Sequence, residues 1–145
     1  PALRLAQLGI LEQAVTSVVY PHMRSQVKAA LESLSDSSLQ ARWGKVEPSA
    51  SYFDDLTLNV HILYDDSMVL PEPSQAVPDI LFDNEVSALE AVGRELGPLI
   101  QALGDSPDDA YTSNERWPSI MKAAKAALRI MRQSDSRHRE AFDSD

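Results

Sequence analysis

The chain has 145 residues, 43% of them apolar and 24% charged, which fits one globular domain and excludes a disordered or fibrous chain. It has no cysteine, and this excludes disulfides, thiolate metal sites and a thiol nucleophile. Thirteen basic and 22 acidic residues give a net charge of -9, which disfavours nucleic acid and anionic membranes as partners and allows a basic one.

The N-terminal part of the chain predicts helices. Residues 3–20 carry leucine and valine at helical spacing without a cleavage site, so we expect residues 1–22 to form an N-terminal helical extension and not a secretory signal. A second helix is predicted from about His22 to Leu34, after Pro21. The polar residues Ser35–Ser38 predict the end of this helix and the N-terminal cap of a further short helix, which continues through Trp43.

The segment Leu56–Tyr64 fits two kinds of secondary structure. Strict alternation places Leu56, Leu58 and Val60 on one face, which is typical of a half-buried strand. The same segment also carries a helical stripe, and Asp54 stands where a helix cap would be. Because the chain offers only weak partner strands, we favour the helix and keep a small hairpin at about 56–70 as the alternative.

The C-terminal part predicts two long helices after an irregular connection. Leu70–Pro78 contains three prolines and is expected to be extended without regular structure. One helix is predicted between Asn84, as its cap, and Gly104, with a kink or break near Gly97 because Pro98 follows. Residues 105–115 are expected to form a polar loop. The last helix is predicted to open with Pro118 at its first turn.

These patterns predict an all-α fold, a compact bundle of five to six helices, with α+β as the alternative if the hairpin forms. The single helical domain is expected over residues 23–132, and a polar tail that frays over residues 133–145. The apolar stripes of the last two helices, which include Leu96 and Trp117, are expected to form the core.

Charge is strongly segregated along the chain. Residues 46–115 hold fifteen acidic residues and one basic residue, Arg94, a net charge of -14, whereas residues 1–45 carry +2 and residues 116–145 carry +3. Such a field suits either a solvated acidic face or a docking face for a basic protein. The candidate partner-binding residues are the paired aspartates of this segment: Asp54, Asp55, Asp65, Asp66, Asp108 and Asp109.

Few residues are arranged in a pattern typical of catalysis or metal binding. Asp54, His61 and Asp65 would share one helix face and form the alternative hypothesis of a metal site or metal-dependent enzyme. No EF-hand, H-E-x-x-H, G-x-S-x-G or glycine-rich phosphate loop occurs. We therefore expect no enzyme activity, no cofactor and no bound metal.

A strip of cations lies on the predicted last helix. Lys122, Lys125, Arg129 and Arg132 fall within about 80° of one face at roughly 100° per residue. Four charges bind nucleic acid weakly, so we interpret the strip as a complement to the helix dipole or to the acidic segment of the same chain.

Three stretches carry a family resemblance: F-D-D-L-T-L-N-V-H-I-L-Y-D-D (Phe53–Asp66), I-L-F-D-N-E-V-S-A-L (Ile80–Leu89) and L-G-D-S-P-D-D-A-Y-T-S-N-E-R-W-P-S-I-M-K-A-A-K-A-A-L (Leu103–Leu128). Together they resemble a loosely defined family of small uncharacterised actinobacterial proteins, over roughly residues 23–132. The resemblance implies a cytoplasmic bacterial protein, similar in size and acidity to the immunity proteins that neutralise polymorphic toxins.

Three functional hypotheses follow. The first is an acidic protein-binding module of immunity type that occludes a basic toxin. The second is the metal-dependent enzyme or metal-binding protein described above, and the third is a structural homodimer.

Overall fold

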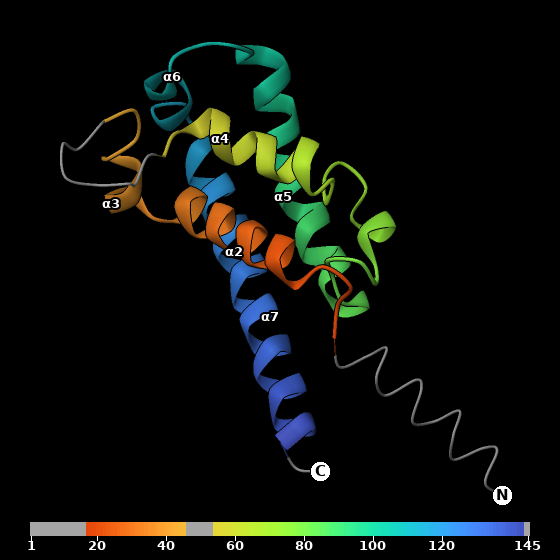
Figure 1. Cartoon of the computed structure of the whole chain (residues 1–145). Coiled ribbons are helices and arrows are strands. Elements are labelled where there is room, and N and C mark those ends of the chain that lie inside the picture. Colours follow the sequence, from red (N-terminus) through yellow and green to blue (C-terminus); the bar gives the residue numbers. More distant parts are fainter. Residues whose placement is uncertain (1–16, 46–53, 144–145) are drawn as a thin grey trace, which may run out of the picture.

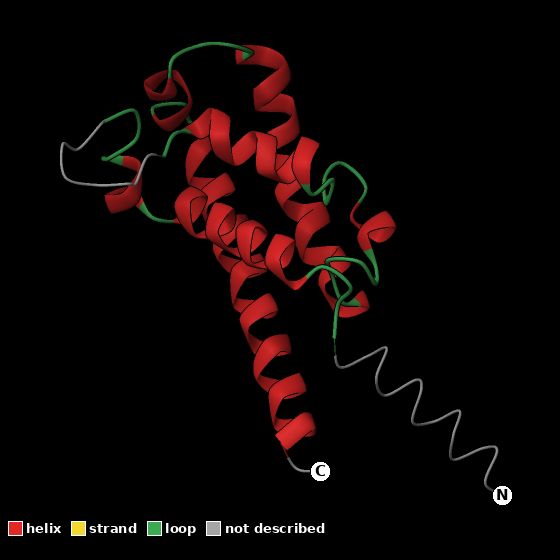
Figure 2. Cartoon of the chain, viewed as in Figure 1, coloured by secondary structure: helices red, strands yellow, loops and turns green. Residues whose placement is uncertain are grey.

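The computed structural model describes residues 17–45 and 54–143, and the predicted helix over residues 3–20 lies mostly outside them. These residues form six α-helices, with three short π- or 3-10 helices between them, and no strand (Figure 2). The all-α prediction is confirmed, and the hairpin at 56–70 does not form in this part of the chain.

Helix α7 (Trp117–Asp143) is the central element of the bundle. It packs against both α2 (Pro21–Ser35) and α5 (Val86–Leu103), while α4 (Leu56–His61) lies alongside α2 (Figure 1). The expected apolar stripes face this core. The buried apolar residues of the three long helices are Val27, Ala30, Leu31, Leu34, Leu89, Val92, Leu96, Leu99, Trp117, Ile120, Ala124, Ala127, Leu128 and Met131.

The ambiguous segment is helical. The Asp55 carboxylate caps α4 by accepting the Leu58 N–H at 2.7 Å, which satisfies one of the free donors at a helix start. Leu56, Asn59 and Leu63 are buried, a three-to-four-residue spacing, whereas Leu58 is 41% exposed. The turn then widens into a π-helix, η1 (Ile62–Asp66), which ends where the Ser67 hydroxyl and N–H both donate to the Ile62 carbonyl.

The proline-rich connection contains more structure than its sequence predicts. Pro73–Ala76 forms a 3-10 helix, η2, whereas an extended segment was expected. Val69 and Leu70 are fully buried, and Leu70 lies so close to α5 that a Cβ at Gly93 would be 3.3 Å from Leu70 Cδ2. Burial of these apolar residues draws the connection onto the bundle.

Helix α5 differs from its prediction at its start and interior. Asn84 is not its cap but lies inside a 3-10 turn, η3 (Asp83–Glu85), where the Glu85 carboxylate accepts the Phe82 N–H. A kink near Gly97 was predicted, with a break as the further alternative, and α5 runs through Pro98 as one helix without the break. Helix α5 ends at Gly104, as predicted. Gly104 has a positive φ of 52°, and its N–H donates a hydrogen bond to the Ile100 carbonyl.

Two further corrections concern the C-terminal part. The loop expected at 105–115 contains a short helix, α6 (Asp108–Thr112), which Tyr111 anchors by burying its ring and donating its hydroxyl to the Gly104 carbonyl at 2.5 Å. The tail expected to fray over residues 133–145 is instead, as far as Asp143, the continuation of α7. Ser134 is fully buried and accepts the Asn84 side-chain amide at 3.1 Å, so this part of α7 is packed against η3.

Candidate functional site

The candidate aspartates fall into two groups at opposite ends of α4 and η1. Asp55 and Asp108 lie at the start of α4, where the Asp108 carboxylate accepts a backbone hydrogen bond from Leu56. Asp65 and Asp66 lie in the last turn of η1. At 1.5 Å per residue the two groups are about 16 Å apart along the helix axis.

The first group is electrostatically crowded. Burial raises the pKa of the Asp108 carboxyl above its ordinary value, the Leu56 N–H lowers it, and the charges of Asp55, Asp109 and Asp54 raise it again. Burial is the largest cause of the raised pKa, and the three neighbouring carboxylates add to it. The structure therefore brings together residues from two segments that are more than fifty positions apart in the sequence.

Asp54 has a structural role. It is buried, and its Oδ2 accepts hydrogen bonds from the Ser33 hydroxyl at 2.5 Å and the Trp43 indole N–H at 3.2 Å. Its Oδ1 accepts the Asn59 amide at 2.9 Å. These bonds join α2, α3 (Ser37–Gln40) and its following turn, and α4, so Asp54 supports the acidic surface from beneath.

The second group is exposed to solvent. Asp65 pairs with His61 one turn earlier on the same helix, and more than half of each side chain is exposed. Asp66 is exposed and, with Met68 and Asp79, lines a mainly apolar pocket. Both carboxylates of this group can therefore be reached by a macromolecular partner.

The metal hypothesis requires Asp54, His61 and Asp65 to converge. Asp54 is engaged in the buried hydrogen bonds described above, whereas His61 and Asp65 are paired at the surface. Among residues 17–45 and 54–143, no group of three or more histidine, aspartate or glutamate side chains is placed to hold a metal ion.

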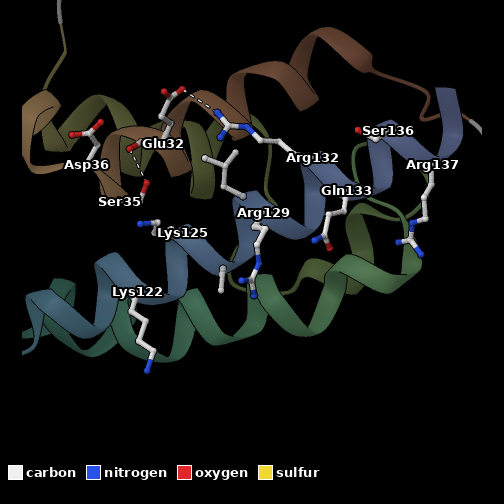
Figure 3. Close-up of a pocket in the computed structure, with 12 residues that line it drawn as sticks. Glu32, Ser35, Asp36, Lys122, Lys125, Arg129, Arg132, Gln133, Ser136 and Arg137 are labelled. Carbon is white, nitrogen blue, oxygen red and sulfur yellow. Dashed lines mark hydrogen bonds and ion pairs between the residues drawn. The ribbon is translucent and has the colours of Figure 1, made fainter. Parts of the chain in front are cut away.

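The cationic strip of α7 lines a groove between α7 and α2. Arg132 reaches Glu32 of α2 at 3.6 Å, while Lys122 and Arg129 point away from α2 (Figure 3). The groove has a volume of about 1000 Å³ and carries five cations, Lys122, Lys125, Arg129, Arg132 and Arg137. Its acidic lining residues are Glu32 and Asp36 of the α2 end, and no acidic residue of segment 54–115 lines it.

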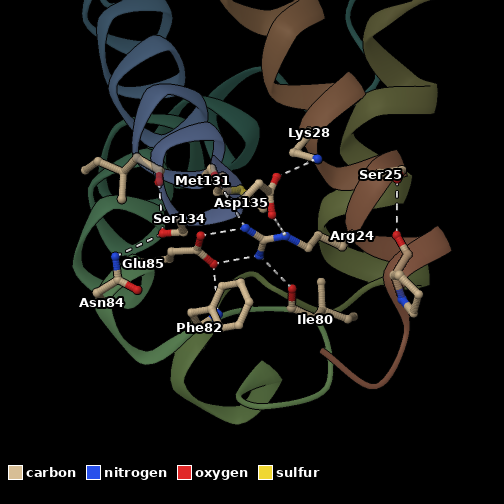
Figure 4. A network of polar contacts seen from close by, with 12 residues as sticks. Arg24, Ser25, Lys28, Ile80, Phe82, Asn84, Glu85, Met131, Ser134 and Asp135 are labelled. Carbon is tan, nitrogen blue, oxygen red and sulfur yellow. Dashed lines mark hydrogen bonds and ion pairs between the residues drawn. The ribbon is translucent and has the colours of Figure 1, made fainter. Parts of the chain in front are cut away.

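A buried ion pair between α2 and η3 was not predicted from the sequence. The Arg24 guanidinium donates to both carboxylate oxygens of Glu85, each at 2.7 Å, and to the carbonyls of Ile80 and Met131 (Figure 4). Asp135 accepts from Arg24 at 3.0 Å and from Lys28 at 2.7 Å. This network holds α2, η3 and α7 together.

Charge and aromatic contacts reinforce the pair. Burial lowers the pKa of Arg24, but the hydrogen bonds and charges of Glu85 and Asp135 raise it more, so its pKa is above the ordinary value. The Phe82 ring lies 4.7 Å from the guanidinium and stacks on His138. An arginine beside the apolar stripe of α2, and a glutamate three residues after Phe82, were the available sequence signals.

The exposed apolar residues gather at one place on the surface. Val19, Tyr20 and Met68 are each more than half exposed and line a pocket of about 580 Å³, which Asp66 and Asp79 also line. The sequence did not predict this pocket, because Val19 and Tyr20 were expected within a helix over residues 3–20, whereas residues 17–20 are not helical.

The fold and surface together define a class: a small all-α domain whose described surface separates an acidic region from a cationic helix face. In the described residues, no helix combines the length and the apolar character needed to cross a bilayer. The chain belongs to the family described as a domain of unknown function, DUF7945, whose model matches residues 18–139. No curated protein and no solved structure gives a significant match to the chain.

Proposed function

We propose that this protein is a binding module that docks a basic protein through the acidic surface of residues 54–115. The observation that carries the proposal is the pairing of the cations. Among the described residues, Arg132 of the α7 strip pairs with Glu32 of α2, and the ion pairs of the acidic segment are made by Arg24, His61 and Arg116, which are not part of the strip. The negative charge of that segment is therefore available to a partner.

Ion pairs within the described residues leave most of this charge uncompensated. From the acidic segment, Glu85 pairs with Arg24 in the interior, and Glu95 pairs with Arg116 at 3.6 Å on the surface. Exposed pairs of the second kind contribute little and are screened by salt. A one-sided field of this size would accelerate encounter with a positively charged protein.

The proposed docking residues form two groups. Asp55, Asp108 and Asp109 lie near the start of α4, and Asp65 and Asp66 lie at the end of η1, which continues α4. Their separation of about 16 Å lies within the width of a standard interface of roughly 800 Å² per partner. Asp54 is assigned to the support of this surface, because its carboxylate is buried and hydrogen-bonded.

We further propose an immunity-type role, in which docking occludes a basic toxin inside the cytoplasm of an actinobacterium. The support is the resemblance of the three motifs, together with the acidity and size of the chain. Occlusion needs only surface complementarity and no metal centre. The described residues contain no cluster of side chains placed to hold a metal ion.

The test is co-expression of the chain with each basic toxic domain encoded beside its gene. We expect the wild-type chain to restore growth, and variants that reverse Asp65 and Asp66, or Asp108 and Asp109, to lysine to fail. Glu32→Lys is the matched control, because it also reverses charge on the surface but lies beside the cationic groove.

Association kinetics separate electrostatic docking from other contacts. The association rate constant with the toxic domain should fall steeply from 0.05 to 0.5 M NaCl, because the Debye length shrinks as salt rises. Circular dichroism would establish that the reversed variants fold. Rates that are insensitive to salt and to both reversals would exclude docking through this surface.

A further inference from the structure

The apolar pocket beside η1 has features of a binding site. Val19, Tyr20 and Met68 are 56%, 57% and 64% exposed, and they account for three of the four large apolar residues exposed in the described part of the chain. The fourth, Leu58, does not line the pocket. Exposed apolar side chains that gather in one concave place mark an interaction site more often than scattered ones do.

The pocket is built on two anchored segments. Backbone hydrogen bonds from Val19 and Tyr20 to the carbonyls of Pro78 and Asp79 hold the start of α2 against the end of the proline-rich connection. On the other side, two hydrogen bonds fix Ser67 to the Ile62 carbonyl, directly before Met68. The apolar side chains therefore project from fixed backbone.

Met68 adopts a backbone conformation that methionine disfavours. Its φ of 56° lies in the left-handed region, and it is the one non-glycine residue with a positive φ in residues 17–45 and 54–143. Glycine or asparagine would fit this position with less strain. A strained residue that exposes its apolar side chain contributes little to folding, and such strain is common at binding sites.

The surroundings of the pocket indicate the chemistry of its occupant. Asp66 and Asp79 are among its lining residues, and Asp65 precedes Asp66 in η1. A partner residue that enters the apolar centre would therefore be flanked by negative charge. A segment complementary to this pocket has an apolar residue between lysine or arginine residues. The apolar residue would fill the pocket, and the cations on either side of it would fix the register of the segment by pairing with the aspartates.

We propose that this pocket, formed by Val19, Tyr20 and Met68 with Asp66 and Asp79, receives an apolar side chain from a cationic segment of the basic partner. The inference rests on the proposed function and deepens it. The acidic surface accelerates encounter, and the apolar pocket holds the complex once it has formed. Methionine suits this role because its unbranched thioether adapts to different anchors.

The test uses a fluorescent probe peptide with a central Phe-Leu pair between two runs of lysine, and anisotropy measures its binding to the full chain. Two matched peptides replace Phe-Leu by Ser-Ser, or every lysine by glutamate. We expect the first change to weaken binding about tenfold or more, the effect of one lost apolar anchor, and the second to abolish it.

Variants of the chain assign the binding to this pocket. Met68→Gly should weaken binding of the Phe-Leu peptide about tenfold and leave the Ser-Ser peptide unaffected, while relief of the positive φ keeps the fold at least as stable. Val19→Ser should act in the same direction. Leu58→Ser is the matched control, because it removes an exposed leucine outside the pocket, and it should change nothing.

Several results would overturn the inference. Equal binding of the Phe-Leu and Ser-Ser peptides, with salt dependence intact, would refute the pocket and leave the proposed docking function standing. Failure of all three peptides, together with failure of growth rescue, would refute both. Dimerisation that Met68→Gly abolishes in ultracentrifugation would assign the pocket to a second copy, and contacts of the Met68 methyl with residues 1–16 by NMR would assign it to the chain itself.

Discussion

The buried pair Arg24–Glu85 provides the most demanding test of the fold. Its side chains are 5% and 0% exposed, and both carboxylate oxygens of Glu85 receive a hydrogen bond at 2.7 Å. Glu85→Ala would leave the guanidinium charge buried beside the carbonyls of Ile80 and Met131 with one remaining carboxylate partner, Asp135. Removal of one partner of a buried ion pair costs about 3–5 kcal/mol, and we expect a loss in this range.

A conservative substitution refines the magnitude. Glu85→Gln keeps an acceptor for the Phe82 N–H but loses the charge and one acceptor for Arg24, so we expect about 3 kcal/mol, the lower end of the range. The double variant Arg24→Met with Glu85→Leu removes both charges. Its loss should be about 2 kcal/mol smaller than the sum of the two single losses, because neither charge is left alone.

Urea unfolding followed by tryptophan fluorescence measures all of these free energies. Trp43 and Trp117 are both buried and lie edge to face with ring centroids 6.0 Å apart, so their emission reports on the packing of the core. A loss below about 1 kcal/mol for Glu85→Ala, or strict additivity of the double variant, would refute the interpretation that the pair is a coupled buried unit.

Three further predictions follow from the core and the titratable groups. Trp117→Ala should destabilise the fold by about 3–5 kcal/mol, and in a Trp43→Phe background Trp117 should emit as a buried indole; a solvent-like maximum would contradict this. Burial raises the pKa of Asp108 in the folded state, so ionisation of this carboxyl costs stability as the pH rises through its folded pKa. Asp108→Asn removes this cost, and it should therefore raise the melting temperature at pH 7 but not at pH 3. Burial and the charge of Arg137 lower the pKa of His138 in the folded state, so protonation of this imidazole costs stability as the pH falls below its unfolded pKa of about 6.5. The melting temperature of His138→Phe, measured over the same pH range, should lack this contribution to the loss of stability in acid.

Local patterns in the sequence determined the long helices. The three-to-four-residue spacing of apolar residues predicted α2, α5 and α7, because the helical period depends on positions within one or two turns. Gly104 marked the end of α5 for the same reason, since its positive φ is a property of a single position. The segregation of charge along the chain could also be counted directly.

The sequence pattern was insufficient where two structures share one local signal. Leu56–Tyr64 alternates like a strand and also carries a helical stripe, and the absence of partner strands in the described residues, with burial of Asn59 and Leu63, decides for the helix. The polar residues after Ser134 resemble a fraying tail. Their helix is packed against the rest of the bundle, because Asp135 pairs with Arg24 of α2 and His138 stacks on Phe82, the residue before η3.

The candidate site depended most on tertiary structure. Asp54 and Asp55 are neighbours in the sequence, but one carboxylate is buried among Ser33, Trp43 and Asn59 while the other caps α4. Arg24 and Glu85 are 61 residues apart, and no local window contains both. Residue type and spacing therefore determined the helices and the charge of each segment. The packing of helix faces decided which charges are paired, which are buried and which remain exposed, because it alone brings distant residues into contact.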